Sequence, residues 1–358
     1  MKKHRLRARL IYNPTSGKEL MKKSVADVLD ILESFGYESS AFQTTPEPHS
    51  AMKEAKRAGL AGFDLVIAAG GDGTINEVVS GIAPLKKRPK MAIIPMGTTN
   101  DFARALKVPR GNPIEAAKLI GKQQTILMDI GQTDRGKYFI NIAAAGSLTE
   151  LTYSVPSQLK SVFGYLAYLV KGAELLPRVQ NVPVKIFHDH GVVEDEVSMI
   201  FVALTNSVGG FETIAPDAKL DDGKFTLILV KTANLIELTH IIGLMLNGGR
   251  HISHSKLEYI KTSYLRIEPQ DPKARRLMIN LDGEYGGDAP VELRNLNNHI
   301  EFIANTDEIA DDAITLDTEE LAMEAIAQKF VREVEYLDEK MEMKEVDEDG
   351  KPSNTTLS

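Results

Sequence analysis

The sequence predicts an α/β domain with a doubly wound parallel sheet, followed by a domain that is an antiparallel β-sandwich. Two observations carry this prediction. Along the first 130 residues, apolar strand-like runs alternate with helical stretches, which is typical of a parallel sheet with helices on both faces. After about residue 131, short strand-like runs separated by turn residues dominate, which is typical of a β-sandwich.

The apolar run Leu65–Ala69 is the strongest local signal in the chain. An apolar run bounded by glycines predicts a buried parallel strand. Three glycines in the next four residues allow a tight turn and let a ligand approach the backbone. Thr74 and Glu77 have capping-box spacing, which predicts that a helix begins there. Together these features predict a phosphate site, because backbone amides and the positive end of a helix dipole attract anions.

Asp72, which stands between these glycines, indicates a bound cation, because a carboxylate beside phosphates usually needs a cation to bridge them. Two better-known phosphate motifs are excluded. A Walker A loop ending in Gly17-Lys18 would need a glycine where Tyr12 stands, and a dinucleotide fingerprint would need its third glycine where Asn76 stands. The alternative interpretation is an ordinary turn between strand and helix, with no ligand.

Two other predicted strands end in turns of the same kind. The strand Arg7–Tyr12 precedes residues 13–19, and the strand Met91–Pro95 precedes residues 96–102, which are rich in Gly, Thr and Asn. In a parallel sheet, ligands bind beyond the carboxyl ends of the strands. Three such ends are more specific than any one of them, and together they predict a nucleotide or phosphate site.

In the first half of the chain, capping residues predict where the other helices begin, and a glycine predicts where one of them ends. Ser16 with Glu19 has capping-box spacing and Gly36 ends the helix that follows, while Asn112-Pro113 is a typical helix start. The predicted elements, in chain order, are strand Arg7–Tyr12, helix Ser16–Phe35, strand Glu38–Phe42, helix Pro48–Arg57, strand Leu65–Ala69, a helix from Thr74, strand Met91–Pro95 and helix Asn112–Ile120.

In the second half the predicted strands are Tyr138–Ala143, Val184–His188, Val197–Thr205, Phe225–Val230, Leu265–Glu268 and Leu277–Leu281. Helical stretches at about 158–176 and 235–246 interrupt them. The apolar part of the first stretch, 159–172, has lysines among its residues and is either a buried core helix or a helix at a lipid interface. After residue 303 the chain becomes acidic, with helical spacing of apolar residues over 321–343 and a disordered end over 345–358.

Composition excludes several classes of function. The chain of 358 residues has no cysteine, so disulfides, thiolate metal sites and a cysteine nucleophile are excluded. No apolar run approaches the roughly 18 residues of a membrane span, so any lipid contact is expected to be peripheral. The net charge is −8, but residues 307–358 hold 17 acidic and 5 basic side chains. The rest of the chain is therefore mildly basic, which suits anionic substrates or membrane surfaces.

Two acidic turns in the second half are candidate sites. Asp222 lies in the turn 217–225, which is either a solvated Asp-Gly turn or a hard-cation site built from one carboxylate and backbone carbonyls. Asp282 and Glu284 follow a strand and lie two residues apart, so in an extended backbone both side chains face the same way. Paired carboxylates can form a general base, although a polar turn explains the pattern equally well.

These motifs together resemble those of the soluble bacterial diacylglycerol kinases, within the wider lipid kinase group. The similarity runs from about Arg5 to Ala304 and rests on five segments: 13–17, 70–74, 95–102, 216–223 and 281–287. The Gly-Gly-Asp-Gly-Thr loop alone is shared with NAD kinases and phosphofructokinases, but all five segments in order are specific to the lipid kinases. The acidic tail departs from the family pattern.

The resemblance implies ATP-dependent phosphorylation of a lipid hydroxyl, with Mg²⁺. It implies that Glu284 is the base and that Asp282 supports it, while Asp72 and Asp129 belong to a network that links the nucleotide metal to the base. It implies a structural Mg²⁺ held by the carboxylate of Asp222 and the backbone carbonyls of Lys219 and Lys224. The residues that the resemblance assigns to ATP are Asn13, Pro14, Thr15, Ser16, Gly17, Thr44, Gly71, Asp72, Gly73, Thr74, Ile75, Asn76, Glu77 and Thr98.

The expected organisation is an ATP-binding domain over 1–130, a lipid-binding and catalytic β-sandwich over 131–304 and an acidic tail over 305–358. The expected function is a cytoplasmic diacylglycerol kinase, peripherally associated with anionic membrane, that makes phosphatidic acid and binds no nucleic acid. The alternatives are a kinase for another lipid alcohol, an NAD kinase, and a nucleotide-sensing protein that has lost catalysis. The sequence leaves the oligomeric state open, with a homodimer as the commonest default.

Overall fold

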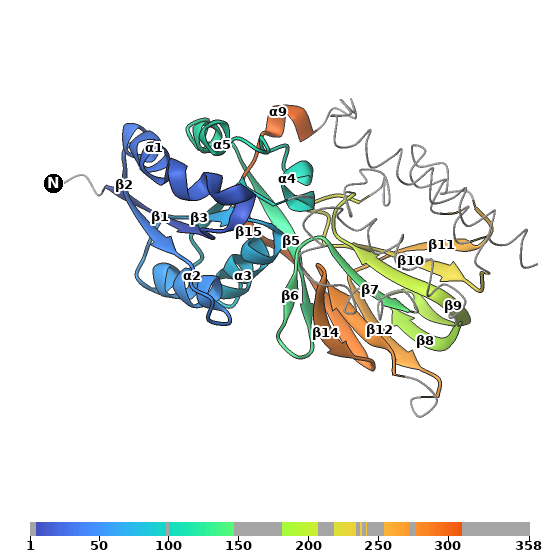
Figure 1. Ribbon diagram of the computed structural model, residues 1–358. Coiled ribbons are helices and arrows are strands. Elements are labelled where there is room, and N and C mark those ends of the chain that lie inside the picture. The colour runs from blue at the N-terminus through green and yellow to red at the C-terminus, as the bar shows by residue number, and fades with distance from the viewer. Residues whose placement is uncertain are drawn as a thin grey trace, which may run out of the picture.

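A computed structural model of the chain describes residues 5–97, 100–146, 181–206, 218–233, 237, 241, 254–271 and 276–309 (Figure 1). The predicted helices at 158–176 and 235–246 and the acidic tail after residue 309 lie mostly or wholly outside these residues. In Figure 1 the α/β domain is at the left and the β domain at the right, and strands β5 and β15 run between them.

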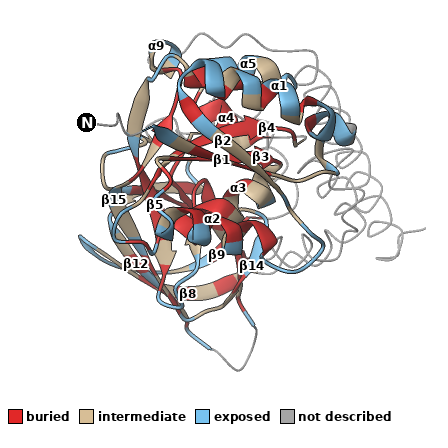
Figure 2. Ribbon diagram, turned by 90° about the vertical axis from the view of Figure 1, so that its left-hand side faces the viewer, coloured by how far each residue is buried: buried red, intermediate tan, exposed pale blue. Residues whose placement is uncertain are grey.

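The first domain is the predicted doubly wound parallel sheet. Its strands are β1 (Leu6–Tyr12), β2 (Tyr37–Gln43), β3 (Leu65–Gly70) and β4 (Lys90–Pro95), paired in the order β2-β1-β3-β4. Helices α1 (Leu20–Ser34) and α5 (Pro113–Ile120) cover one face, and α2 (Ser50–Leu60) and α3 (Asp72–Ile82) cover the other (Figure 1). Strand β3 is buried along its whole length (Figure 2), as its continuous apolar sequence predicts.

The second domain is built from antiparallel strand pairs around its own core. Phe139 and Phe225 stack in this core with ring centroids 5.7 Å apart. The strands are β6 (Tyr138–Phe139), β7 (Ile142–Gly146), β8 (Val182–His188), β9 (Gly191–Ala203), β10 (Phe225–Lys231), β11 (Leu257–Thr262), β12 (Tyr264–Pro269), β13 (Met278–Leu281) and β14 (Glu284–Asp288). The predicted β-sandwich class is confirmed.

Two long strands join the domains. Strand β5 (Thr125–Thr133) leaves the first domain and pairs antiparallel with β15 (Val291–Ile303), which returns the chain to it. The end of β15 pairs in parallel with β4, where Phe302 lies opposite Met91. Phe302 is fully buried and meets the ring of Phe102 at 4.9 Å, from the short helix α4 (Asp101–Ala105). A segment almost 200 residues from Phe102 therefore completes the first core.

Four strands were not predicted: β5, β11, β14 and β15. The sequences of the last three explain why. β14 contains two glycines, which are depleted in strands. β15 contains Asn295, Asn297 and Asn298, which are typical turn residues, and its pairing with β5 shifts register between Leu296 and Ile300. β11 alternates only weakly between apolar and polar residues. Pairing with neighbouring strands, rather than local propensity, forms these elements.

Two predicted helix starts are wrong. The helix that was expected to begin at Ser16 begins instead with a 3₁₀ turn over Ser16–Glu19, and α1 follows from Leu20. Helix α3 begins at Asp72, two residues before the predicted capping box, with Gly71 at the N-cap. In contrast, the predicted cap of α5 is confirmed, because the Asn112 side chain accepts hydrogen bonds from the amides of Ile114 and Glu115.

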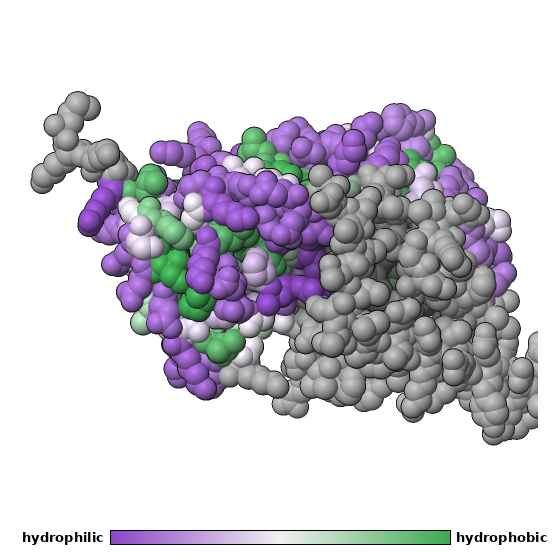
Figure 3. Space-filling view, turned by 90° about the horizontal axis from the view of Figure 1, so that it is seen from above, coloured by the Kyte–Doolittle hydropathy of each residue, from purple (hydrophilic) through white to green (hydrophobic). Residues whose placement is uncertain are grey.

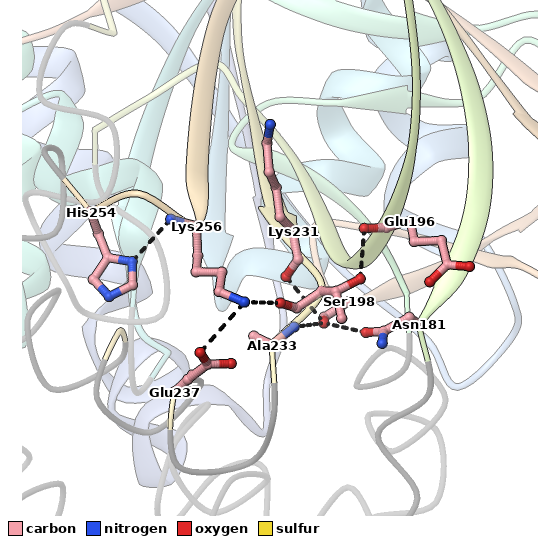
Figure 4. A network of polar contacts seen from close by, with 9 residues as sticks. Asn181, Glu196, Ser198, Lys231, Ala233, Glu237, His254 and Lys256 are labelled. Atoms are coloured by element: carbon pink, nitrogen blue, oxygen red, sulfur yellow. Dashed lines mark hydrogen bonds and ion pairs between the residues drawn. The ribbon is translucent and has the colours of Figure 1, made fainter.

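A polar cluster closes the end of the β9–β10 pair (Figure 4). The buried Ser198 hydroxyl donates to Asn181 Oδ1 at 2.8 Å and accepts from the Ala233 amide at 3.1 Å. The Lys256 ammonium donates to the Thr232 carbonyl at 2.6 Å. Because these groups satisfy one another where the strand pairing shifts register, the cluster has a structural explanation.

Among the residues that the structure describes, none of the helices is long and apolar enough to cross a bilayer. Seen from above, the described surface is mainly hydrophilic, with scattered apolar side chains (Figure 3).

Phe302→Ala should destabilise the first domain, because it removes a buried ring from the core to which β15 returns. Loss of a buried phenylalanine typically costs about 3–5 kcal/mol, which should lower the denaturant midpoint in equilibrium unfolding. Leu127→Ala on the neighbouring β5 is the control, since Leu127 is 50% exposed and should change stability little. Equal midpoints for Phe302→Ala and wild type would contradict this role of β15.

Candidate active site

Three turns meet at the carboxyl edge of the parallel sheet, as predicted. The backbones of Gly71 and Gly97 touch: a Cβ added to Gly97 would lie 2.8 Å from the Gly71 Cα. Gly17 has a φ of +60° and lies against Met96, whose Cε would be 2.6 Å from an added Cβ. The turns after β3 and β4 therefore pack backbone to backbone, which requires glycine at Gly97. The turn after β1 packs against the Met96 side chain, and its positive φ favours glycine at Gly17.

The N-terminal end of α3 lies at this junction. Gly71 is the N-cap, and the amides of Thr74 and Ile75 both donate to its carbonyl. Gly71 has no side chain with which to cap this first turn, and Asp72 is the acidic residue within it. The positive end of the α3 dipole is thus available to an anion at the meeting point of the three turns.

Glu77 does not form the predicted capping box with Thr74. Its carboxylate Oε2 instead accepts hydrogen bonds from the amides of Ala51 and Met52, at 3.0 and 3.3 Å, and so caps α2. This carboxylate occupies the positive end of the α2 dipole and so does not cap α3. Thr44, another residue assigned to ATP by resemblance, lies just after β2 and donates its amide to the Tyr12 carbonyl at 2.9 Å.

Asn100 closes the turn after β4, and it was not among the predicted site residues. Its side chain pairs with both backbone groups of Gly97, accepting from the amide at 2.8 Å and donating to the carbonyl at 2.6 Å. Its own amide donates to Asp72 Oδ2 at 3.2 Å, which joins two of the three turns. The usable sequence signal was an asparagine in a glycine-rich turn, since asparagine tolerates the observed φ of +49°. Thr98 lies outside the described residues.

Asp282 and Glu284 are not in the extended backbone assumed from their spacing. Asp282 and Gly283 have φ values of +49° and +92°, and Leu281 pairs with Glu284 across them. They form a two-residue hairpin turn of the primed type. The prediction that the two carboxylates share one face is therefore wrong, and each has its own environment.

The carboxylate of Asp282 is held by four donors. Oδ2 accepts from the Ile140 amide at 2.7 Å and from Asn76 Nδ2 at 2.8 Å. Oδ1 accepts from the amides of Asn141 and Ile142, both at 2.9 Å. Burial raises the pKa of the Asp282 carboxyl, and these hydrogen bonds act in the opposite direction. Because its oxygens are engaged by the protein, Asp282 anchors the hairpin.

Glu284, in contrast, is exposed where β14 begins. The backbone beside it is fixed, because Lys137 Nζ donates to the Tyr285 carbonyl at 2.8 Å and Arg276 donates to the Tyr285 hydroxyl at 2.7 Å. A carboxylate that is accessible on a fixed strand can receive a proton from a bound hydroxyl group.

Asp129 and Asp222 belong to a second acidic region at the β5–β15 pair. The buried Asp129 carboxylate accepts from the amides of Gly223 (2.6 Å) and Asn298 (2.8 Å) and from Asn297 Nδ2 (3.0 Å). Burial raises the pKa of Asp129, and the nearby Asp222 charge acts in the same direction. Asp129 thus holds the turn that contains Asp222 against β15.

The residues around Asp222 suit a hard cation by their chemistry. The turn offers a carboxylate and the main-chain carbonyls of Lys219 and Lys224, which are oxygen ligands of the type that Mg²⁺ prefers. The Asp222 carboxylate accepts from the Lys224 amide at 3.0 Å and lies 3.4 Å from the Lys261 ammonium, a cation that already offsets its charge. Within the described residues, three or more acidic or histidine side chains do not gather at any point that could hold a metal.

The fold places the N-terminal part of α3, in an α/β domain, beside a carboxylate hairpin of a β domain. Residues 7–133 match the family described as "Diacylglycerol kinase catalytic domain". Residues 151–304 match the family described as "YegS C-terminal NAD kinase beta sandwich-like domain".

Individual relatives agree with these matches. The chain is 49% identical to a diacylglycerol kinase of Bacillus subtilis (strain 168), over 83% of this chain and 96% of the relative. It is 48% identical to a diacylglycerol kinase of Staphylococcus haemolyticus (strain JCSC1435), over 84% of this chain and 88% of the relative. A crystal structure from Bacillus anthracis str. Sterne, assigned to a diacylglycerol kinase, has a TM-score of 0.72 at 29% identity and covers 85% of this chain and 97% of that one.

The chain belongs to the bacterial diacylglycerol kinase family, and it is accordingly a lipid kinase. The resemblance noted in the sequence is therefore confirmed at the level of the family. The roles of individual residues stay predictions.

Gly97→Ala should loosen the junction of the three turns, because the new Cβ would meet the Gly71 Cα at 2.8 Å. Overpacking of this kind typically costs about 1–3 kcal/mol, which should lower the melting temperature in the absence of nucleotide. Gly71→Ala is the matched comparison: its Cβ would lie 3.5 Å from the Gly97 Cα, an ordinary contact, so the melting temperature should hold. Equal melting temperatures for the two variants would contradict the close contact.

Proposed function

We propose that this chain transfers the γ-phosphoryl group of ATP to the free hydroxyl of diacylglycerol and releases phosphatidic acid. The observation that carries the proposal is the hydrogen bond between Asn76 and Asp282, which brings the N-terminal part of α3 against the hairpin of Glu284. An anion site and an accessible carboxylate are thereby adjacent, as phosphoryl transfer to an alcohol requires.

We assign phosphate binding to the turns around α3 and proton transfer to the hairpin, because these two parts of the site offer different chemical groups. The turns after β1, β3 and β4 bind the phosphates through backbone amides at the end of α3, and Asp72 takes part with a bridging cation. Glu284 accepts the proton of the acceptor hydroxyl, which is hard to ionise at neutral pH. Asp282 orients the hairpin and leaves Glu284 as the proton acceptor. Little covalent chemistry is needed, since positioning and charge stabilisation dominate phosphoryl transfer.

Mg²⁺ is proposed at two places in the protein. Near Asp72, a Mg²⁺ ion bound together with the nucleotide would neutralise the negative charge of the phosphates. At the turn of Asp222, Lys219 and Lys224, it would stabilise the arrangement that Asp129 already holds. The second site is distant in sequence from the proposed base and is assigned a structural role.

Glu284→Gln should lower kcat by about 10²- to 10⁴-fold, the usual cost of losing a general base. The amide keeps the size of the side chain but cannot take up the proton. ATP affinity should stay nearly unchanged, because the proposed phosphate contacts come from the other domain. The measurements are kcat with diacylglycerol in mixed micelles and nucleotide titration by calorimetry.

Glu115→Gln is the control for this experiment, since Glu115 is an exposed carboxylate on α5 that pairs with Lys118. It should match wild type in both measurements. Wild-type turnover by Glu284→Gln would remove Glu284 as the base.

Substrate identity is tested with labelled ATP and a panel of diacylglycerol, other lipid alcohols and NAD⁺. Phosphate incorporation into diacylglycerol alone would support the proposal. Incorporation into NAD⁺ or another lipid alcohol would replace it. Nucleotide binding without transfer to any acceptor would instead indicate a sensing protein.

The proposal includes peripheral association with an anionic membrane, because the substrate is a lipid and the chain without its acidic tail is mildly basic. We expect a homodimer, which is the commonest oligomeric state of soluble proteins. The acidic tail is proposed to be dispensable for catalysis, since the family similarity ends at residue 304.

Asp222→Ala should abolish a Mg²⁺-dependent rise in melting temperature. A ligand that binds only the folded state stabilises it by mass action, so Mg²⁺ should raise the melting temperature of the wild type. Lys261→Met should increase this rise, because it removes the ammonium that lies 3.4 Å from the carboxylate. The measurement is thermal unfolding with and without millimolar Mg²⁺ and no nucleotide. An identical Mg²⁺ response in wild type and Asp222→Ala would exclude Asp222 as a ligand.

A further inference from the structure

The side chain of Asn76 is fully engaged by the protein itself. Its amide nitrogen donates to Asp282 Oδ2 at 2.8 Å and to the Tyr138 carbonyl at 3.3 Å. A side-chain amide has two N–H donors, and both are used. Its oxygen faces the Ser80 hydroxyl at 3.4 Å, one turn further along α3. The two groups opposite the nitrogen are both acceptors, which fixes the orientation of the amide.

We propose that Asn76 is a positioning residue that ties the nucleotide turn of α3 to the hairpin of Glu284, rather than a residue whose side chain binds ATP. This inference rests on the proposed function, in which Glu284 is the base. It changes the role that the family resemblance assigned to Asn76.

The hydrogen bond from Asn76 to Asp282 positions Glu284 through the backbone of the hairpin. Of the four donors to Asp282, three are amides of residues 140–142 in the second domain, and Asn76 alone comes from the α/β domain. A hydrogen bond from an amide to a carboxylate is charge-assisted and therefore stronger than a neutral one. Asp282 begins the turn that ends at Glu284, so a shift of Asp282 moves Glu284 with it.

The same contact sets the distance between the two reacting parts of the site. Asn76 lies in the second turn of the helix whose N-terminus is the anion site. Tyr138, whose carbonyl accepts the other hydrogen bond, is in β6 and precedes the amides that hold Asp282. The two domains are thus held at one place by a single side chain that contacts both the hairpin and its support.

The test is Asn76→Ala in the full-length chain. We expect kcat to fall by about 10²-fold, the cost of a misplacement near 1 Å in a reacting geometry, while the KM for ATP stays within about twofold of wild type. We also expect faster hydrogen exchange at the amides of residues 140–142, which lose a fixed acceptor. Asn76→Asp, which replaces the donor with a second carboxylate facing Asp282, should lose at least as much kcat.

Asn112→Ala is the matched control. It also removes an asparagine side chain that makes two hydrogen bonds, but at the start of α5. It should lower the melting temperature and leave kcat and the exchange of residues 140–142 unchanged. A double variant of Asn76→Ala with Asp282→Asn should lose little more kcat than the worse single variant, because the two side chains act as a unit.

A raised KM for ATP with an unchanged kcat would overturn the inference and make Asn76 a nucleotide ligand. Unchanged exchange at residues 140–142 would also overturn it. If the wild-type protein phosphorylates no diacylglycerol, the proposed function fails, but the exchange measurement still decides whether Asn76 holds the hairpin.

Discussion

The buried carboxylate of Asp282 is the interaction on which the arrangement of the site depends. An ionised carboxylate removed from water is costly unless donors replace its hydration. Here the donors come from two places, the amides of residues 140–142 and the side chain of Asn76. The full set exists only when α3 lies against the hairpin. Separating α3 from the hairpin would leave this buried carboxylate with one donor fewer. That loss is unfavourable, so the carboxylate stabilises the observed arrangement of the two domains.

Asp129 shows the same principle at the other polar junction. It is almost completely buried, and its donors come from the turn at Gly223 and from Asn297 and Asn298 of β15. The carboxylates of Asp129 and Asp282 thus both accept hydrogen bonds from segments that lie more than 90 residues away in sequence. The asparagines that interrupt β15 as a strand are thus the groups that satisfy Asp129, which gives a physical reason for the irregular pairing there.

The proposed anion site depends on glycine in the turns that meet at the start of α3. Gly71 and Gly97 allow the turns after β3 and β4 to touch, and Asn100 locks the second turn through its side chain. Glu77 is drawn to the end of α2, where it satisfies two amides. Two neighbouring helices on one face of the sheet therefore differ: the amides at the start of α2 are capped by Glu77, whereas α3 begins at Gly71 and Asp72 beside the turn after β4.

The sequence by itself determined the doubly wound sheet, the sandwich class, the cap of α5 and the meeting of three glycine-rich turns. These features depend on local periodicity and on residues that permit particular backbone angles. The tertiary structure alone decided that β15 completes the first core, that Glu77 caps α2, and that Asp282 faces Asn76 across 206 residues of chain. Sequence spacing placed Asp282 beside Glu284 in extended backbone, whereas the paired strands turn the chain at Asp282 itself. Long-range hydrogen bonds satisfy buried charges, and such partners leave no periodic pattern from which a sequence could predict them.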